Sequence, residues 1–356
     1  MLMLIGMLGC DDVGSDLQSA TGEADSRTTV LATVDAKEKQ QSSIYGYKDA
    51  PIQAGHSAIY CASFQLAWDA LRDEVVKEEV KLANAPNWIA QANQGKATGV
   101  VESSYCIAMA GKAEEGILRD IRFAMADQFE LQYDMPSDIS DNEVVAFAYL
   151  HKRMRFFKAF EPDYYLSFQG EEVEAFGFSQ GYKNPVHKSR ILVYDYKNDD
   201  DFILEIGSRR LGEKLIFAKV PPKATLEATY ESVMSRCKPE SKGFVQEHEN
   251  LLIPYMSFCL EEEFEGLQGK AFQNADLEGY QLDRLLQIVR FDLRETGATD
   301  AEVSQVEDME PAIATTAKAR HFIFDKPFLV ILKGGTRKPP FFLMWVGNTE
   351  LMGKGV

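Results

Sequence analysis

Apolar positions follow a helical period in the first part of the chain and a strand period in the second. In residues 57–76, Phe64, Trp68 and Leu71 recur at spacings of three and four residues, which predicts an amphipathic helix, and residues 113–130 repeat this pattern. A short helix is predicted at residues 225–234, and strands are predicted at residues 144–150, 202–206, 215–220, 251–258, 285–293, 322–332 and 340–346. Helices first and strands later predict an α+β fold rather than alternating parallel units.

Composition and charge narrow the class of protein. The chain has 356 residues, of which 45% are hydrophobic and 26% are charged, so it is long enough for one large packed domain or two smaller ones. The formal net charge of −17 argues against nucleic acid or an anionic membrane surface as a partner, because carboxylates repel phosphate. The sequence has no run of 18 apolar residues and therefore predicts no membrane-spanning helix.

The first ten residues are apolar and end in Gly9 and Cys10. This end resembles the lipobox of bacterial lipoproteins, in which the cysteine is lipidated, although it lacks a basic segment and is short for a signal. Residues 11–55 are rich in small and polar residues and predict a flexible linker. We therefore expect a signal remnant at 1–10, a linker at 11–55 and a folded domain at 56–356. The domain is expected outside the bacterial cytoplasm, in contact with the membrane only through the lipid on Cys10; an ordinary N-terminus is the alternative.

Four cysteines remain without Cys10. Their even number allows up to two disulfides with three possible pairings, whereas the apolar neighbours of most of them are at least as typical of buried free thiols. The four are Cys61, Cys106, Cys237 and Cys259. The histidines lack the spacing of a zinc site and the acidic clusters lack the spacing of a calcium loop, so we expect neither a metal nor a cofactor.

One motif is typical of an enzyme. Residues 177–181 read Gly-Phe-Ser-Gln-Gly, which matches the G-x-S-x-G turn of α/β-hydrolases and would make Ser179 a nucleophile. In those enzymes a helix follows the serine, and Pro185 is expected to deny that helix its first turns. A surface turn flanked by glycines is therefore the favoured interpretation, and a serine hydrolase is the less favoured alternative.

The segment at residues 295–321 connects two predicted strands and has no apolar face of its own. Long connections of this kind are usually functional or unstructured. In its first part, Thr299, Ala301 and Val303 alternate with polar residues, as along one side of an extended chain. Residues 312–319 are small, which is typical of a protease target.

Several segments, taken in order, resemble the serpin family. Residues 324–329 and 340–344 look like the paired C-terminal strands of serpins. Residues 285–293, followed by residues 294–297, look like the strand and the hinge that open the reactive loop. The resemblance also includes residues 144–161 and 195–220, within a match that covers roughly residues 144–346.

The resemblance implies a serine-type endopeptidase inhibitor with N-terminal helices, a large central β-sheet and an exposed reactive loop at about residues 295–321. A serine or cysteine protease cleaves the loop, which then inserts into a gap in the sheet and traps the protease. Such an inhibitor is a monomer and not an enzyme. Counting along the loop places the cleaved bond at Ala312–Ile313, or nearer Thr316 when counted back from Phe324. A small residue at that bond suits an elastase-like protease.

Insertion requires a hinge whose inward side chains are small and uncharged, because a buried lone carboxylate is costly. The direct alignment after Gly297 would turn Asp300 and Glu302 inward and stall insertion. The favoured alignment allows one extra residue and turns those acids outward. The hinge residues are then Glu295, Gly297, Thr299, Ala301, Val303 and Gln305.

Three positions depart from the family. Phe156 replaces a tryptophan near the top of the central sheet, and Gln287 replaces a buried histidine. The serine–proline–serine pattern that helps to control sheet opening is reduced to Ser103–Ser104. These departures leave open a second function, that of a non-inhibitory serpin-fold binding lipoprotein whose loop never inserts.

Overall fold

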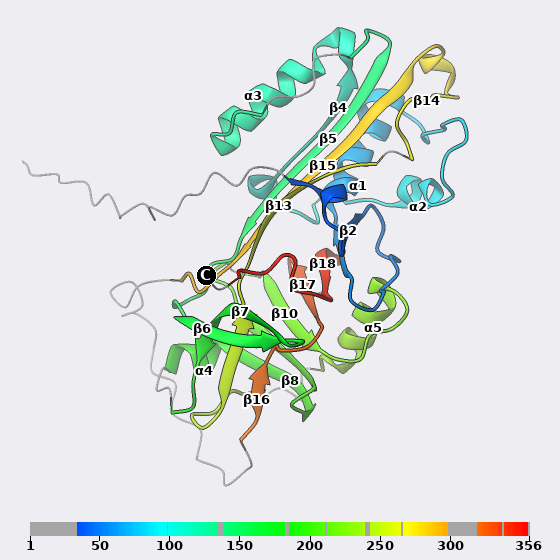
Figure 1. Ribbon diagram of the computed structural model, residues 1–356. Coiled ribbons are helices and arrows are strands. Elements are labelled where there is room, and N and C mark those ends of the chain that lie inside the picture. The colour runs from blue at the N-terminus through cyan, green and yellow to red at the C-terminus, as the bar shows by residue number, and fades with distance from the viewer. Residues whose placement is uncertain are drawn as a thin grey trace, which may run out of the picture. The chain divides into compact units, whose positions relative to one another are not determined.

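The described strands form three β-sheets, which we call sheets A, B and C (Figure 1). Most of the buried side chains belong to these strands. The α+β class expected from the sequence is confirmed. The computed structural model describes residues 34–97, 99–133, 139–181, 185–210, 212–238, 243–264, 266–297, 319–336 and 338–354.

Sheet A is built around two long parallel strands, β5 (Glu143–Arg153) and β15 (Gln281–Leu293). Its order is β1-β13-β15-β5-β4, and the short strand β14 pairs with one end of β15. Strand β5 is buried along nearly its whole length, as expected for a parallel strand that is covered on both faces. The other strands of sheet A are β1 (Val34–Asp35), β4 (Cys106–Lys112), β13 (Met256–Glu263) and β14 (Lys270–Ala271).

Helices cover both faces of sheet A, with α1 (Ser63–Ala70) on one side and α3 (Ile117–Phe129) on the other (Figure 1). On the inner face, Ala146 and Ala148 belong to the same buried cluster as Phe64 of α1. On the outer face, the ring of Tyr149 lies 4.8 Å from that of Phe129 in an edge-to-face contact. The alternation of side chains along β5 therefore serves both layers.

Sheet B is the largest sheet and has the order β11-β8-β9-β10-β17-β18-β3-β2. All its strand pairs are antiparallel except β2–β3. Every residue of β17 and β18 is buried. The strands are β2 (Ser42–Tyr45), β3 (Ser57–Cys61), β8 (Ile191–Asn198), β9 (Asp201–Gly207), β10 (Lys214–Lys219), β11 (Gly243–Phe244), β17 (Phe328–Lys333) and β18 (Pro340–Val346).

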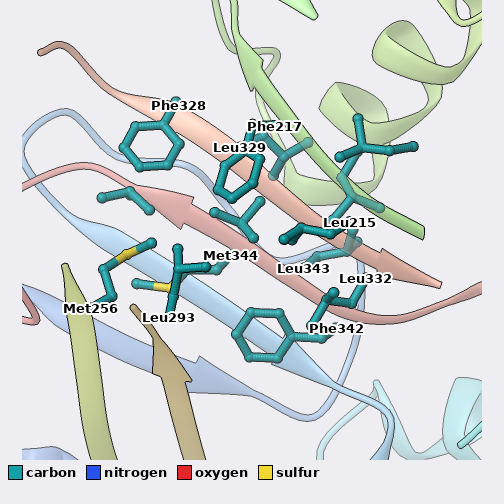
Figure 2. Packing of buried hydrophobic residues seen from close by; sticks show 14 of the residues in the cluster. Leu215, Phe217, Met256, Leu293, Phe328, Leu329, Leu332, Phe342, Leu343 and Met344 are labelled. Atoms are coloured by element: carbon teal, nitrogen blue, oxygen red, sulfur yellow. The ribbon is translucent and has the colours of Figure 1, made fainter. Parts of the chain in front are cut away.

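The main core lies between the inner face of sheet A and sheet B. Phe291 of β15 stacks on Phe342 of β18, with ring centroids 4.8 Å apart. Figure 2 shows Met256 and Leu293, from two strands of sheet A, in one cluster with Met344 of β18. The two sheets are therefore joined by direct apolar packing at the end of β15.

Sheet C and the remaining helices complete the described residues. Sheet C has the order β16-β12-β7-β6, with strands β6 (Glu161–Phe168), β7 (Glu171–Phe178), β12 (Asn250–Pro254) and β16 (His321–Ile323). Thr225 caps helix α5 (Leu226–Arg236) by accepting a hydrogen bond from the Ala228 amide (3.2 Å). The remaining helical segments are η1 (Ala36–Glu38), the π-helical η2 (Leu71–Val76), α2 (Ile89–Gln94), η3 (Ser103–Tyr105), η4 (Ala113–Glu115), α4 (Pro185–Arg190), α5 (Leu226–Arg236) and η6 (Ala275–Leu277).

Three segments differ from their predicted structure. Residues 57–76 begin with strand β3, and the helix starts only at Ser63. All five residues of β3 are buried, so this strand lacks the alternation that would separate it from a helix. The runs 251–258 and 322–332 each divide into two strands that belong to different sheets. The first break falls at Tyr255, where the run has no polar interruption. The second falls at residues 324–327, where Asp325, Lys326 and Pro327 form a turn signal that the prediction of a single strand overlooks.

Part of the expected linker is folded. Strand β2 pairs in parallel with β3, and Ser42 and Ile44 are only 2% and 5% exposed. Asn348 donates a hydrogen bond to the Gln41 carbonyl (2.5 Å), which ties this segment to the C-terminal end. The linker prediction therefore does not hold for residues 42–45, because sheet pairing outweighs their polar composition. Cys10 and residues 11–33 lie outside the described residues.

The four remaining cysteines are free thiols, which is the second of the two arrangements that the sequence allows. Burial raises the pKa of Cys61 to about 11 and that of Cys106 to about 12, so both are thiols at neutral pH. Within the described ranges, no group of histidine, cysteine and acidic side chains could hold a metal ion. No helix in those ranges is both long enough and apolar enough to cross a membrane.

Candidate functional site at the seam between β5 and β15

The central feature of sheet A is the seam between β5 and β15. The two strands are parallel and pair from Gln281 and Glu143 at one end to Asp292 and Arg153 at the other. A strand that followed β15 after a tight turn would run antiparallel to β15, and therefore antiparallel to β5 as well. A parallel pair is thus the arrangement into which the segment after β15 could insert with hydrogen bonds on both sides.

The gap expected from the sequence is not present at this seam. The strands pair directly along their length, with one irregularity between Leu282 and Arg284. An inserted strand would have to break this ladder and move β5 away from β15 by one strand spacing, about 4.8 Å. The expectation of a waiting gap is therefore wrong, and the seam is closed.

The residues after β15 extend the seam along residues 154–160. The amide of Phe156 donates to the Thr296 carbonyl, and that of Phe160 donates to the Glu295 carbonyl, both at 2.9 Å. The Thr296 hydroxyl donates to the Met154 carbonyl at 3.0 Å. The first hinge residues are therefore held by the backbone that follows β5.

Gly297 sits where no side chain fits. A Cβ atom at this position would lie 2.3 Å from the Ala159 nitrogen and 2.3 Å from the Lys158 carbonyl carbon. Gly297 forms an isolated parallel bridge with Phe156, which also bridges to Ser208 of the segment after β9. Glycine is thus required here for close approach of two backbones.

His187 contacts the same backbone segment at Lys158 and Phe160. Its Nε2 lies 3.0 Å from the Lys158 carbonyl oxygen, and its ring stacks on Phe160 with centroids 4.2 Å apart. Burial lowers the pKa of His187 to about 4, so the imidazole is neutral at pH 7. Glu295 is anchored as well: burial raises the pKa of Tyr255, and a hydrogen bond to Glu295 raises it further.

A buried polar contact lies behind the seam on its inner face. Gln287 is fully buried, and its Nε2 donates to the Ser63 hydroxyl (2.7 Å) and to the Cys61 carbonyl (3.3 Å). The Cys61 thiol and the Ser63 hydroxyl are 3.0 Å apart. Gln287 is therefore fixed by the junction between β3 and α1.

Gln287 contacts Ser63, not the pair Ser103–Ser104 that the resemblance gives as the remnant of the serine pattern. Both serines are exposed in η3, where Ser104 accepts a hydrogen bond from Arg210 (3.4 Å). The true partners are in the junction at residues 61–63, which the predicted helix over 57–76 concealed. A serine between an apolar run and an amphipathic helix was the signal in the sequence that could have identified them.

A second polar contact crosses the seam on its outer face. The carboxylate of Asp292 on β15 lies 3.4 Å from His151 Nε2 on β5 and accepts a hydrogen bond from the Ser257 hydroxyl on β13 (2.6 Å). Burial acts to raise the pKa of Asp292, but the interactions with His151, Ser257 and Arg290 outweigh it and hold this pKa below its usual value. Asp292 therefore links three adjacent strands.

The G-x-S-x-G segment has a structural explanation. A Cβ atom on Gly177 would lie 1.8 Å from the Leu251 carbonyl oxygen, so this glycine allows β7 to pair closely with β12. Ser179 is exposed just after β7. Helix α4 does begin at Pro185, contrary to expectation, because proline is tolerated in the first turn of a helix. That start lies six residues after Ser179, whereas the helix of a nucleophile elbow starts at the serine.

The remaining predicted loop residues lie outside the described residues. These are Thr299, Ala301, Val303, Gln305, Ala312, Ile313 and Thr316. The chain is described up to Gly297 and again from Ala319. Beyond the loop, Arg320 pairs with the buried carboxylate of Glu249 at 2.5 Å, so both ends of the loop are anchored.

Comparison with known proteins gives a likeness in structure. No family model and no curated protein matches the sequence. The structure of mouse protein-Z dependent protease inhibitor is 12% identical, with a TM-score of 0.53 over 82% of this chain and 91% of that chain. A tumour suppressing serpin (12% identical) and native protease nexin-1 with heparin (10% identical) each have a TM-score of 0.51 over 82% of this chain and 92% of theirs. The chain therefore has the serpin fold, as the resemblance of residues 144–346 predicts.

Proposed function

We propose that this chain is a serine-type endopeptidase inhibitor that acts by cleavage and insertion of the loop at about residues 295–321. The observation that carries the proposal is the parallel seam, which ends in a hinge held by residues 154–160. Two of the solved structures with a similar fold are named as a protease inhibitor and a protease nexin. The likeness itself supports the fold, and the activity rests on the geometry of the seam.

Insertion offers a net gain in backbone pairing. Opening the seam breaks one parallel ladder, whereas an inserted strand forms two antiparallel ladders, one with β5 and one with β15. Each additional backbone hydrogen bond contributes roughly 0.5–1.5 kcal/mol. Cleavage frees the loop to make this exchange, so we infer that the uncleaved protein is metastable.

The loop residues are assigned from the sequence alone. We propose Ala312–Ile313 as the cleaved bond, with Thr316 as the alternative, and an elastase-like protease as the target. Thr299, Ala301 and Val303 would enter the sheet with inward side chains. Ala301→Asp should then convert the inhibitor into a substrate, because a carboxylate would be buried without a partner. Glu302→Gln, on the opposite side of the strand, is the matched control and should remain inhibitory.

Incubation with a panel of serine proteases tests this function. We expect an SDS-resistant complex with at least one elastase-like enzyme. Mass spectrometry should identify a released C-terminal peptide that begins at Ile313. A protein nicked in the loop should melt at a markedly higher temperature than the intact protein. Digestion of residues 306–320 by every protease, without a complex and without a change in melting temperature, would contradict the proposal.

A non-inhibitory binding protein with the same fold is the second candidate. The observation that favours it is Gln287, which occupies the interior polar position of the seam with contacts to Cys61 and Ser63. The direct hinge alignment would turn Asp300 and Glu302 inward, which would prevent insertion and so favour the non-inhibitory function as well. A loop that is cut without any rise in melting temperature would support this second function.

We further propose that the protein is a monomer tethered outside the bacterial cytoplasm through a lipid on Cys10. The apolar start followed by Gly9-Cys10 supports the tether. Expression with an alkyne fatty acid should label the wild-type chain and leave Cys10→Ser unlabelled. Equal labelling of both would contradict the anchor and would leave the inhibitory function unaffected.

A further inference from the structure

The outer face of sheet A changes character along the seam. The outward side chains of Val145, Phe147 and Tyr149 on β5 are buried, and Tyr149 contacts α3. The next outward positions are His151 and Arg153, and Arg155 continues the alternation. Both arginines are exposed, whereas their neighbours Lys152 and Met154 are buried. The uncovered end of β5 is therefore a row of basic side chains.

Along β15 the outward side chains also change from apolar to basic, at the position paired with His151 of β5. Leu286 and Ile288 are buried, and Arg290 is the next outward residue, paired in register with His151. Arg290 and His151 both approach Asp292, which places their side chains on one face. Arg294 follows β15 directly and is partly exposed. We call His151, Arg153, Arg155, Arg290 and Arg294 the seam patch.

The seam patch has few counter-charges. Asp292 is the only carboxylate within ion-pair distance of the patch among the described residues, and it is shared by His151 and Arg290. Within the same ranges, Arg153, Arg155 and Arg294 form no ion pair. A concentration of four arginines around one carboxylate contrasts with the net charge of −17 for the whole chain. Like charges on two adjacent strands repel each other unless an anion lies between them.

We propose that the seam patch binds a small soluble anion with two or three phosphate or sulfate groups across the β5–β15 seam. Guanidinium groups bind such oxyanions through paired hydrogen bonds. Neighbouring strands are about 4.8 Å apart and alternate residues about 6.8 Å apart, so the patch matches two or three tetrahedral groups. A long polyanion would extend beyond the patch along a chain whose net charge is −17, which disfavours it.

Binding at the seam patch controls the opening of the seam, an effect that rests on the proposed function. A strand inserted between β5 and β15 would roughly double the distance between the two basic rows, by about 4.8 Å. An anion that contacts both rows therefore binds the closed seam more tightly than the open one. By linkage, the anion slows loop insertion and is released when the loop inserts.

Calorimetric titration of the full chain with inorganic tripolyphosphate tests the binding site. The triple variant Arg153→Gln/Arg155→Gln/Arg294→Gln should bind at least tenfold more weakly than wild type. The charge-matched control Arg119→Gln/Lys238→Gln/Lys354→Gln, at exposed positions elsewhere, should bind within twofold of wild type. The single variant Arg155→Gln changes one exposed position and should weaken binding partially. It tests the site with a protein that is expected to fold normally. Equal weakening by both triples, or no saturable binding by wild type, would overturn the proposal.

A lipid headgroup carries the same chemistry as a soluble phosphate, so vesicles form a second arm. Vesicles with phosphatidylglycerol should not compete with tripolyphosphate for the wild-type protein. Preferential binding to those vesicles would overturn the assignment of a soluble ligand.

The rate of complex formation with a responsive protease tests the coupling. Tripolyphosphate should slow this rate for wild type and for the control triple, and should leave the rate of the patch triple unchanged. An equal effect on all three proteins would overturn the coupling. If no protease forms a complex even without the anion, the inhibitory function fails, and the calorimetric result still decides the site.

Discussion

The seam of sheet A and the paired strands β17 and β18 of sheet B are held together in different ways. All residues of β17 and β18 are buried, and packing on both faces, including the stack of Phe342 on Phe291, stabilises them. Strands β5 and β15 are also largely buried, but a parallel ladder joins them and polar contacts flank it, with Gln287 behind it and Asp292 in front of it. Packing is lost when strands part, whereas a ladder can be replaced by another strand. Sheet B is thus suited to be the fixed part and sheet A the part that opens.

The largest expected effect lies in sheet B. Phe342→Ala should lower the free energy of unfolding by about 3–5 kcal/mol, because it leaves a cavity between β18 and the inner face of sheet A. Chemical denaturation measures this change. Tyr165→Ala, at a side chain 54% exposed on the edge strand β6, is the control and should change stability by no more than about 0.5 kcal/mol. Similar losses for both would refute a core at β18.

The second largest expected effect is a loss of folding stability at acid pH, caused by His187 near the end of the seam. In the unfolded chain the imidazole of His187 takes up a proton near pH 6.5, but burial lowers the pKa in the folded protein to about 4. The unfolded state therefore binds more protons between these values, and stability falls as the pH drops from about 6.5 to 4, by up to roughly 3 kcal/mol.

His187→Phe isolates this contribution. It keeps the stack on Phe160, removes the titrating group and should flatten this part of the pH profile. Unfolding curves at pH 7, 5.5 and 4 measure the effect. If the stability of the variant falls between pH 7 and 4 as much as that of the wild type, groups other than His187 cause the acid response.

A smaller and more local effect is expected at the hinge. Gly297→Ala should cost about 1–3 kcal/mol, because its Cβ would overlap the backbone of Lys158 and Ala159. Faster hydrogen exchange should be confined to residues 154–160 and 292–297. Gly243→Ala is the matched control, since nothing lies within 4 Å of a Cβ there. Equal exchange in both variants would argue against a tightly held hinge.

The smallest effect is expected behind the seam. Ser63→Ala should cost about 1–2 kcal/mol, since Gln287 loses its shorter hydrogen bond in a buried site. The double variant Ser63→Ala/Gln287→Leu should recover most of this loss, because both partners become apolar. A double-mutant cycle gives the coupling, and strictly additive losses would show that the contact is unimportant.

Local patterns in the sequence predict the apolar strands β5 and β18 but not the strand β3 or the short helix α2. The run at residues 144–150 lies within β5, and the prediction for residues 340–346 coincides with β18, because both are apolar runs bounded by turn residues. Residues 57–61 were hidden because a fully buried strand can share the spacing of a helix. The short helix α2, in a stretch with the composition of turns, was missed for lack of an apolar stripe.

The candidate site depends on the register in which the strands pair, and the composition of the chain does not predict this register. Glu295 and Gly297 were identifiable from the hinge-like sequence after β15. Their cradle at residues 154–160 and the contact of Gln287 with Ser63 depend on residues more than 130 positions away. A shift of one residue in strand pairing would have placed different side chains together. Polar partners of this kind become visible only when the strand order is known.

The position of β18 has a consequence for how the protein is made. Among the described residues, strands β2 and β3 join the rest of sheet B only through β18, which follows β3 by more than 270 positions. Before the residues of β18 leave the ribosome, the apolar edge of β3 has no neighbour on that side. Strand β3 of the nascent chain therefore waits for β18 before it can complete its pairing, and this interval is when chaperones would be needed most.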